Sequence, residues 1–250
     1  KMKYVFGVDI GGTTVKIGLF DVEGNVLDKW EIPTRTENDG EEILPDVADS
    51  IREKMKQMDK DAIAGVGVGA PGPIDAGGVV HRAVNLGWKT FNVKETLEAL
   101  INLPVRAGND ANVAALGEMW MGGGKGYKDL VVVTLGTGVG GGIIVDGRMI
   151  SGSTGAAGEI GHIHVDDTET DVCNCGNKGC LEQFASATGI TRLANKKLAS
   201  TDMDSVLRGG EVSAKTVFDA VKARDPLAME VAERFGKYLG DALAAVAGVV

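Results

Sequence analysis

Residues 4–20 read YVFGVDIGGTTVKIGLF, and residues 130–147 read LVVVTLGTGVGGGIIVDG. In both stretches, apolar runs rich in β-branched residues flank a turn of glycine and threonine, which predicts a β-hairpin. In the second stretch we expect a first strand at Leu130–Leu135, a turn over Gly136–Gly142, a second strand from Ile143, and a further hairpin turn at Asp146-Gly147. The recurrence in both halves indicates an internal duplication, with two related domains facing each other across a cleft.

The glycine-rich stretch Met121–Lys128 separates the two hairpins, and we place the domain boundary there. This gives an N-terminal α/β domain over residues 1–120 and a larger C-terminal α/β domain over residues 121–250. In the first domain, further strands are predicted at Asn25–Ile32, Ala62–Gly69 and Val105–Ala107, and helices at Glu41–Met58, from Asn92 to Leu100 and at Ala111–Trp120.

The C-terminal domain becomes mainly helical from Gln183 onward. Asp225-Pro226 is a good N-cap followed by proline at the first helical position, and it opens a long helix toward Val250. Because the apolar helical pattern is still running at Val250, we expect this domain to be incomplete at its C-terminus.

Composition excludes several classes of protein. The 250 residues are 44% hydrophobic and 24% charged, which is typical of a chain that folds around a sizeable core. The net charge of -9 and the lack of a basic cluster argue against a nucleic-acid or anionic-membrane partner. The longest apolar run, Ala242–Val250, is far shorter than the ~18 residues of a membrane span. We expect a cytoplasmic protein.

Both glycine turns are candidate phosphate sites. Phosphate binding needs several backbone N–H groups converging on one anion, and glycine lets the chain approach that closely. Each turn alone is equally well explained as a tight hairpin, but the pair favours phosphate. Gly136, Gly138 and Gly141 match the dinucleotide fingerprint, yet that motif needs a helix where Gly142–Gly147 predicts strand and turn. Asp9, beside the first turn, is suited to holding Mg²⁺ near the phosphates.

The cysteines form the most specific chemical signal. The spacing Cys173-x-Cys175-x₄-Cys180 places three thiolates on a glycine-rich loop, which suits a tetrahedral Zn²⁺ site. His162 and His164 lie two residues apart on an expected strand, hence on one face, so either could supply the fourth ligand. Three structural thiols without metal are the alternative.

Five motifs together resemble those of the ROK family of bacterial sugar kinases, and they are most similar to ROK glucokinases. They are DIGGT at 9–13, GND at 108–110, LGTGVGGG at 135–142, EIGH at 159–162 and CNCGNKGCLE at 173–182. The resemblance implies an α/β fold of the actin-like ATPase (ribonuclease H-like) type, with two domains around a central cleft. It also implies a homodimer and further residues beyond a helix like Asp225–Val250, which contribute to the adenosine pocket.

The resemblance also implies site roles. Asp110 matches the catalytic base, and His162 matches a residue that serves both sugar and zinc. The zinc ligands would be His162, Cys173, Cys175 and Cys180. The sugar-binding residues would be Gly72, Asn85, Asn109, Asp110, Glu159, His162 and Glu182. The ATP-binding residues would be Asp9, Gly11, Gly12, Thr13, Thr14 and Lys16 in the first turn, and Gly136, Thr137, Gly138, Gly140 and Gly141 in the second.

The implied activity is Mg²⁺-ATP-dependent phosphorylation of the 6-hydroxyl of a hexose, with glucose as the expected substrate, the first step of glycolysis. Kinases for mannose, N-acetylglucosamine or N-acetylmannosamine share most of the motifs and stay open as alternatives. A sugar-binding regulator of the same family is the other alternative. The first hairpin begins at Tyr4 and the chain is acidic, which disfavours a DNA-binding repressor.

Overall fold

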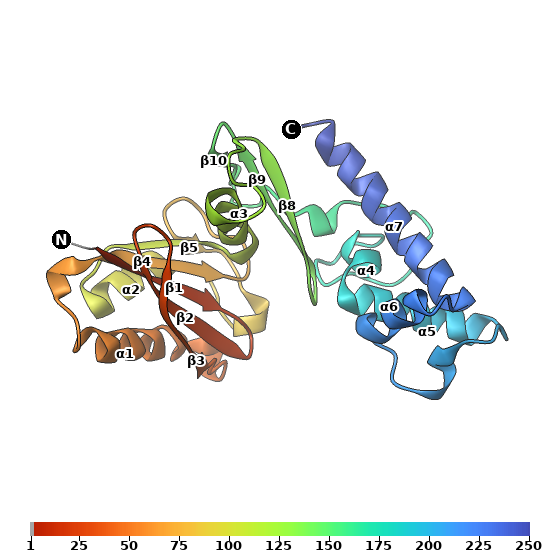
Figure 1. Cartoon of the computed structure of the whole chain (residues 1–250), viewed down its shortest axis with the longest axis horizontal. Helices are drawn as coiled ribbons and strands as arrows, with labels where there is room; N and C mark the ends of the chain where they lie inside the picture. Colours follow the sequence, from red (N-terminus) through yellow and green to blue (C-terminus); the bar gives the residue numbers. More distant parts are fainter. Residues whose placement is uncertain (1–2) are drawn as a thin grey trace. The chain divides into compact units, whose positions relative to one another are not determined.

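The computed structural model describes residues 3–250 of the chain. Its contacts divide the chain into two compact units (Figure 1). Unit 1 comprises the described residues up to Val132 together with Gly142–Ala157, and unit 2 comprises Val133–Gly141 and Gly158–Val250. The division therefore passes through both strands of the second hairpin.

Unit 1 is built on a five-stranded sheet of order β3-β2-β1-β4-β7. The strands are β1 (Tyr4–Ile10), β2 (Thr14–Asp21), β3 (Val26–Pro33), β4 (Ile63–Ala70) and β7 (Val105–Asn109), with a small pair β5 (Val79–Val80) and β6 (Phe91–Asn92). The helices are α1 (Ile43–Met55), α2 (Val93–Ile101) and α3 (Asp110–Met121), with short 3-10 turns η1 (Asn38–Gly40), η2 (Lys60–Ala62) and η3 (Val84–Leu86). The first predicted hairpin is confirmed, because β1 and β2 pair antiparallel around Gly11–Thr13.

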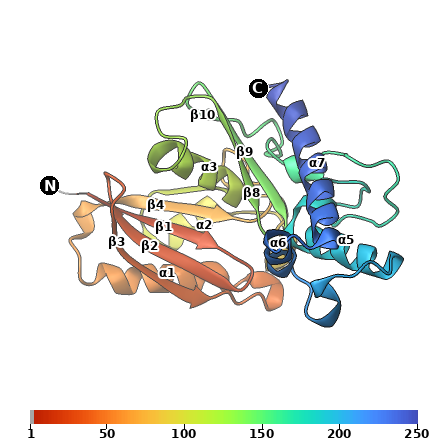
Figure 2. The ribbon, with the colours of Figure 1, turned by 45° about the vertical axis from the view of Figure 1, so that its right-hand side comes forward.

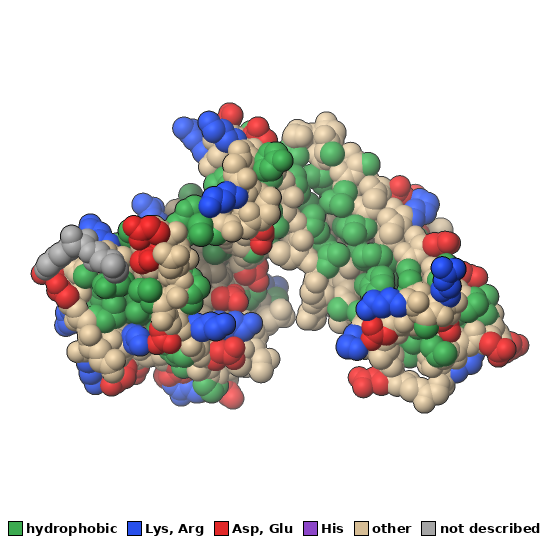
Figure 3. Space-filling model, in the orientation of Figure 1, with side chains coloured by type: hydrophobic (Ala, Val, Ile, Leu, Met, Phe, Trp, Pro, Cys, Tyr) green, Lys and Arg blue, Asp and Glu red, His purple; other side chains and the backbone are tan. Residues whose placement is uncertain are grey.

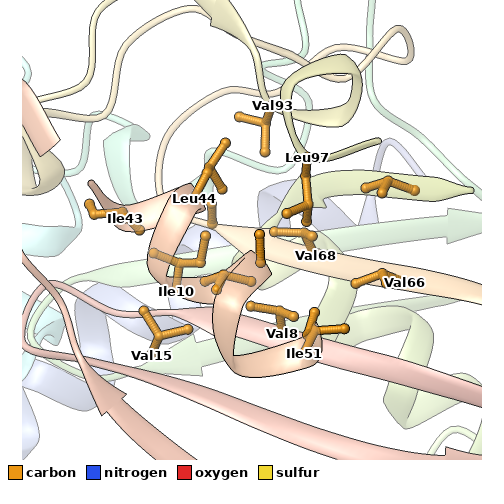
Figure 4. Packing of buried hydrophobic residues seen from close by; sticks show 14 of the residues in the cluster. Val8, Ile10, Val15, Ile43, Leu44, Ile51, Val66, Val68, Val93 and Leu97 are labelled. Atoms are coloured by element: carbon orange, nitrogen blue, oxygen red, sulfur yellow. The ribbon is translucent and has the colours of Figure 1, made fainter. Parts of the chain in front are cut away.

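Alternation along β4 explains the layers of unit 1. Val66 and Val68 point into the core that α1 and α2 cover (Figure 4). Gly69 lies on the opposite face, where a side chain would contact Asp110 and Val113 of α3. Because valine side chains project from one face of β4, α1 packs on that face through side chains. Because glycine occupies the other face, α3 can approach the sheet backbone closely. Figure 2 shows α1 lying along the sheet.

The second hairpin also forms, with a shorter turn than predicted. Strand β8 (Leu130–Leu135) is followed by β9 (Val139–Val145), which begins at Val139 rather than at Ile143. Glycines 140–142 are thus part of a strand, because its backbone must approach other elements: a side chain at Gly142 would collide with Ala115 of α3. The predicted turn at Asp146-Gly147 is confirmed, with positive φ at both residues, and leads into β10 (Arg148–Met149). A strand at this position excludes the dinucleotide-binding helix.

Unit 2 is mainly helical, as predicted. Its elements are η4 (Ile160–His162), α4 (Glu182–Ala185), α5 (Ala187–Ser200), η5 (Val206–Gly209), α6 (Ala214–Lys222) and α7 (Pro226–Ala247). The Asp225 carboxylate accepts the Ala228 N–H at 2.9 Å, so the predicted cap of α7 is confirmed. Phe184, Leu193 and Leu227 are buried in the core between α4, α5, α6 and α7.

Two surface properties bear on partners. On the face of unit 1 in Figure 3, basic and acidic side chains are interspersed rather than gathered by sign. Between residues 3 and 250, the helices all fall short of the length and apolarity that crossing a bilayer requires.

Candidate active site

The carboxyl ends of three parallel strands bring Asp9 and Asp110 to one edge of the unit 1 sheet. In the register, Asp9 of β1 lies beside Gly69 of β4, and Gly69 lies beside Gly108 of β7, two residues before Asp110. The carboxyl edge of a parallel sheet is where α/β proteins place ligand-binding residues. Asp9 is exposed there, opposite Lys16 of β2 in the antiparallel register.

Asn109 is the N-cap of α3 and so fixes the start of this helix at Asp110. It is only 8% exposed, and its carboxamide oxygen accepts the N–H groups of Ala111 at 3.0 Å and Asn112 at 3.2 Å, which caps α3. Its side-chain nitrogen donates to the Gly72 carbonyl at 3.1 Å. The structure thus brings together Asn109, Asp110 and Gly72. The amide oxygen of Asn109 is committed to the cap, and one N–H of the side chain is committed to Gly72.

Asp110 has a raised pKa. Loss of surrounding water is the main cause, although part of the residue stays open to solvent, and the nearby Asp9 charge adds to it. The Ala111 N–H, which donates to the Asp110 carboxylate at 2.7 Å, acts in the opposite direction. A raised pKa makes the Asp110 carboxylate a stronger base than an ordinary aspartate.

The first glycine turn is tied to a residue that the sequence analysis missed. The Gly11 N–H donates to the Thr14 carbonyl at 3.0 Å, which closes the turn. Thr34, just after β3, donates its hydroxyl to the Gly11 carbonyl at 2.7 Å and its N–H to the Thr13 carbonyl at 2.9 Å. A side chain on Gly12 would come within 3.8 Å of the Asn85 backbone, so Asn85 lies beside this turn. Thr34, more than 20 positions away, therefore adds to the local hydrogen bond that closes the turn.

The second glycine turn is held by helices of unit 2. The Gly136 and Thr137 carbonyls accept the Ala187 N–H at 2.8 Å and the Thr188 hydroxyl at 2.9 Å. Glu182 accepts the Val139 N–H at 2.9 Å, and a side chain on Gly138 would collide with its carboxylate. Gly140 and Gly141 lie on β9. The structure therefore joins Glu182 to the second turn, and Glu159 lies half-buried just before η4 in the same unit.

The metal-ligating atoms of His162, Cys173, Cys175 and Cys180 all lie within 4.8 Å of one another. The Cys175 and Cys180 sulfurs are 3.6 Å apart, and the Cys173 sulfur is 3.8 Å from Nδ1 of His162. Tetrahedral zinc bonded to sulfur at about 2.3 Å and nitrogen at about 2.0–2.1 Å requires separations of about 3.8 Å and about 3.6 Å, respectively. The four residues fit zinc in chemistry, and these two separations are close to the required ones.

His162 rather than His164 joins this group. The expected strand does not form: His162 ends the 3-10 turn η4, and His164 makes only an isolated bridge with Cys180. His164 uses its ring nitrogens for the Lys178 carbonyl at 3.0 Å and Asp167 at 2.8 Å. Because both ring nitrogens of His164 already have these partners, His162 is the histidine that groups with the three thiols.

The thiols do not titrate alike. Burial, together with the adjacent thiols of Cys175 and Cys173, raises the pKa of Cys180 to about 12. Burial also opposes ionisation of Cys175, but hydrogen bonds from Asn177 and the other two cysteines lower its pKa. A shared divalent cation would remove the cost of holding several thiolates together.

An ionic cluster that the sequence analysis missed joins the cysteine loop to α5. Arg192 donates to Glu169 at 2.7 Å and to Asp171 at 2.8 Å, and Lys196 contacts Asp171 at 2.6 Å. The Glu169 side chain is 6% exposed. Burial alone would raise its pKa, but Arg192 and the Asp171 N–H lower it to about 2. Because the partners are more than 20 residues apart, no local pattern could have revealed them.

A cavity of about 590 Å³ lies beside the second glycine turn, between α5 and the start of α6. Its wall includes Thr137 of the turn, Thr188, Arg192 and Lys196 of α5, and Ser213 before α6. The volume is within the range of small-molecule sites, about 300–1,000 Å³. Hydroxyl groups and the glycine turn form the polar part of this wall, while its two cations, Arg192 and Lys196, are already paired with Glu169 and Asp171.

Comparison with known proteins places this geometry in a family. Residues 5–250 match the family model described as "ROK family". A glucokinase of Halalkalibacterium halodurans is 43% identical over 99% of this chain and 77% of its own length. A ROK family glucokinase from Streptomyces griseus, solved with glucose and AMPPNP, aligns with a TM-score of 0.78 and 33% identity over 100% of this chain and 80% of that one. A xylose repressor of Caldicellulosiruptor bescii is 32% identical over 93% of this chain but only 60% of its own length. The expected mixed α/β fold of ROK sugar kinases is confirmed.

Proposed function

The chain belongs to the ROK family, and on that premise we propose that it is a glucokinase that transfers the γ-phosphoryl group of ATP to the 6-hydroxyl of glucose. The observation that carries the proposal is Asp110, a carboxylate of raised pKa at the carboxyl edge of the unit 1 sheet. The glucokinases of 35–43% identity support the choice of reaction and of sugar.

Asp110 is the proposed catalytic base. A hexose hydroxyl is a poor nucleophile, so Asp110 would orient it toward the phosphoryl group and accept its proton late in a loose transition state. The Asn109 cap and the tie to Gly72 hold the carboxylate in one position. Gly72, Asn85, Asn109, Glu159, His162 and Glu182 are the proposed residues that bind the sugar.

The two glycine turns are the proposed phosphate sites, with backbone N–H groups as donors to the phosphoryl oxygens. Mg²⁺ bound with ATP neutralises charge on those oxygens. Asp9 is the residue that would hold it, because it offers an exposed carboxylate beside the first turn.

The proposed zinc site is structural. Four protein ligands complete a tetrahedron and leave no open position for catalysis. Cys180 and Glu182 are two residues apart, so a fixed Cys180 also restrains the carboxylate that binds the Val139 N–H.

The decisive assay measures ADP formation from Mg-ATP with glucose, mannose, N-acetylglucosamine and N-acetylmannosamine offered separately. We expect glucose to give the highest kcat/KM. Asp110→Asn should lower kcat by about 10²–10⁴-fold while glucose binding persists. Asp202→Asn, an exposed aspartate in the loop after α5, is the matched control. Turnover of Asp110→Asn at the wild-type rate would refute the assignment of the base.

Sugar binding without turnover in the wild-type protein would instead favour a sugar-binding regulator. The family resemblance further supports a cytoplasmic homodimer, and analytical ultracentrifugation would test the dimer.

A further inference from the structure

We propose that Arg192 is a positioning residue that couples the metal loop to the cavity beside the second glycine turn. The metal loop is the segment 169–183, which carries the three cysteines. Through this coupling, metal and nucleotide would each strengthen binding of the other. The inference rests on the proposed function, which supplies a nucleotide for the cavity. The link lies wholly within unit 2.

Arg192 is anchored on the metal loop at three points. Its guanidinium donates to Glu169 at 2.7 Å, to Asp171 at 2.8 Å and to the Gln183 carbonyl at 2.9 Å. It also stacks over the Phe184 ring at 5.4 Å. Two of these contacts flank the metal ligands directly, since Asp171 precedes Cys173 by two residues and Gln183 follows Cys180 by three.

Gln183 closes the loop between those points. Its side-chain oxygen accepts the N–H of Cys180 at 3.1 Å, and its side-chain nitrogen donates to the Asp171 carbonyl at 2.9 Å. The Gln183 side chain thus connects Asp171, which precedes the first cysteine, to Cys180, the last cysteine. Arg192 in turn donates to the backbone carbonyl of Gln183. A displacement of Cys180 would therefore be transmitted to Arg192 through two hydrogen bonds, one between Cys180 and Gln183 and one between Gln183 and Arg192.

The other side of Arg192 faces the candidate ligand site. Arg192 and Lys196 are part of the cavity wall with Thr137 and Thr188. Within the described residues, the buried Nε of Arg192 has no hydrogen-bond partner, although its other two nitrogens both donate hydrogen bonds. An unsatisfied buried donor is costly, which leaves this guanidinium with unused capacity at the boundary between loop and cavity.

Coupling follows from sharing one rigid group. Ordering the metal loop fixes Arg192, and a ligand that orders the cavity wall fixes the same helix turn, so whichever binds second finds the wall already ordered. Linkage requires the effect to be reciprocal. We expect a several-fold effect, within the range of about 5–150-fold that is typical of coupled sites.

The test measures zinc release from the zinc-loaded protein to a chromophoric chelator, with and without saturating Mg-AMPPNP. In the wild-type protein, AMPPNP should slow zinc release about fivefold or more. In Arg192→Met, which keeps the apolar contact with Phe184, zinc should still bind but AMPPNP should change its release by less than twofold. The KM for ATP should rise while the KM for glucose stays unchanged.

Lys197→Met is the matched control. Lys197 lies on the same helix but pairs with Glu230 of α7 rather than with the metal loop, so it should behave as wild type. Arg192→Lys keeps the charge without the forked geometry and should give intermediate coupling, which covers the case where Arg192→Met fails to fold.

AMPPNP binding by calorimetry separates the two proposals. If AMPPNP binds the wild-type protein but leaves zinc release unchanged, or if Arg192→Met retains full slowing, the coupling is wrong and the kinase assignment stands. If AMPPNP does not bind the wild-type protein and no sugar is phosphorylated, both are overturned.

Discussion

Replacement of Asn109 by alanine isolates the residue that positions the proposed base. The Asn109 side chain is 8% exposed and makes three hydrogen bonds, two as the cap of α3 and one to the Gly72 carbonyl. Asn92 caps α2 by accepting the Glu95 N–H at 3.0 Å and donates to the Gly77 carbonyl at a longer 3.4 Å, but it is only half-buried. The two asparagines therefore form a matched pair that differs mainly in burial.

The magnitude follows from these contacts. Loss of a helix cap costs about 0.5–2 kcal/mol, typically ~1. Asn109→Ala also leaves the Gly72 carbonyl without its partner, and because Gly72 is half-buried this costs about 1 kcal/mol, the lower end of the range for a buried group. We expect Asn109→Ala to lower the free energy of unfolding by about 2 kcal/mol or more and Asn92→Ala by about 1 kcal/mol.

Urea unfolding followed by tryptophan fluorescence measures this directly. All 3 tryptophans, at positions 30, 88 and 120, belong to unit 1, so the signal reports the unit that contains Asn109. Asn109→Asp separates the two effects, because a carboxylate can cap α3 but cannot donate to Gly72. Equal losses for Asn109→Ala and Asn92→Ala would refute the reasoning that the partly buried hydrogen bond to Gly72 adds to the cap.

Three further predictions concern unit 2. Hydrogen bonds and cations hold the pKa values of Asp166 and Glu169 at about 2, below their ordinary values, so their stabilisation is complete above about pH 5 and is lost as pH falls toward 2. In Glu169→Gln, the melting temperature should fall less steeply than in the wild type between about pH 5 and about pH 2. An unchanged slope would contradict this prediction. Chelation should release one zinc ion per chain and lower the melting temperature; metal analysis showing none bound would contradict the four-ligand site. Gly179→Ala should weaken zinc affinity, because φ is +70° and a Cβ would collide with the Asp166 carbonyl, whereas Gly176→Ala, also at positive φ but in open space, should be milder.

Local features of the chain were read correctly from the sequence. The hairpin around Gly11–Thr13, the turn at Asp146-Gly147 and the cap Asp225 depend on residues within a few positions of one another. The cysteine spacing belongs to the same class, since glycine and three thiols on one short loop already limit the possible geometry. Neighbouring residues constrain one another strongly because little chain entropy is lost in bringing them together.

The tertiary structure decided what depends on distant partners. The start of β9 at Val139 follows from packing of its glycines on α3 and η4, which hydrophobic pattern alone does not reveal. The choice of His162 over His164 depends on where Asp167 and Lys178 hold the second ring. Glycine at position 142, Thr34 on the first turn and Arg192 on the metal loop all act across 20 or more residues. Such contacts are set by how sheets and helices pack. The sequence therefore predicted which groups take part in the proposed chemistry, and the packing determined which side chains hold those groups in position.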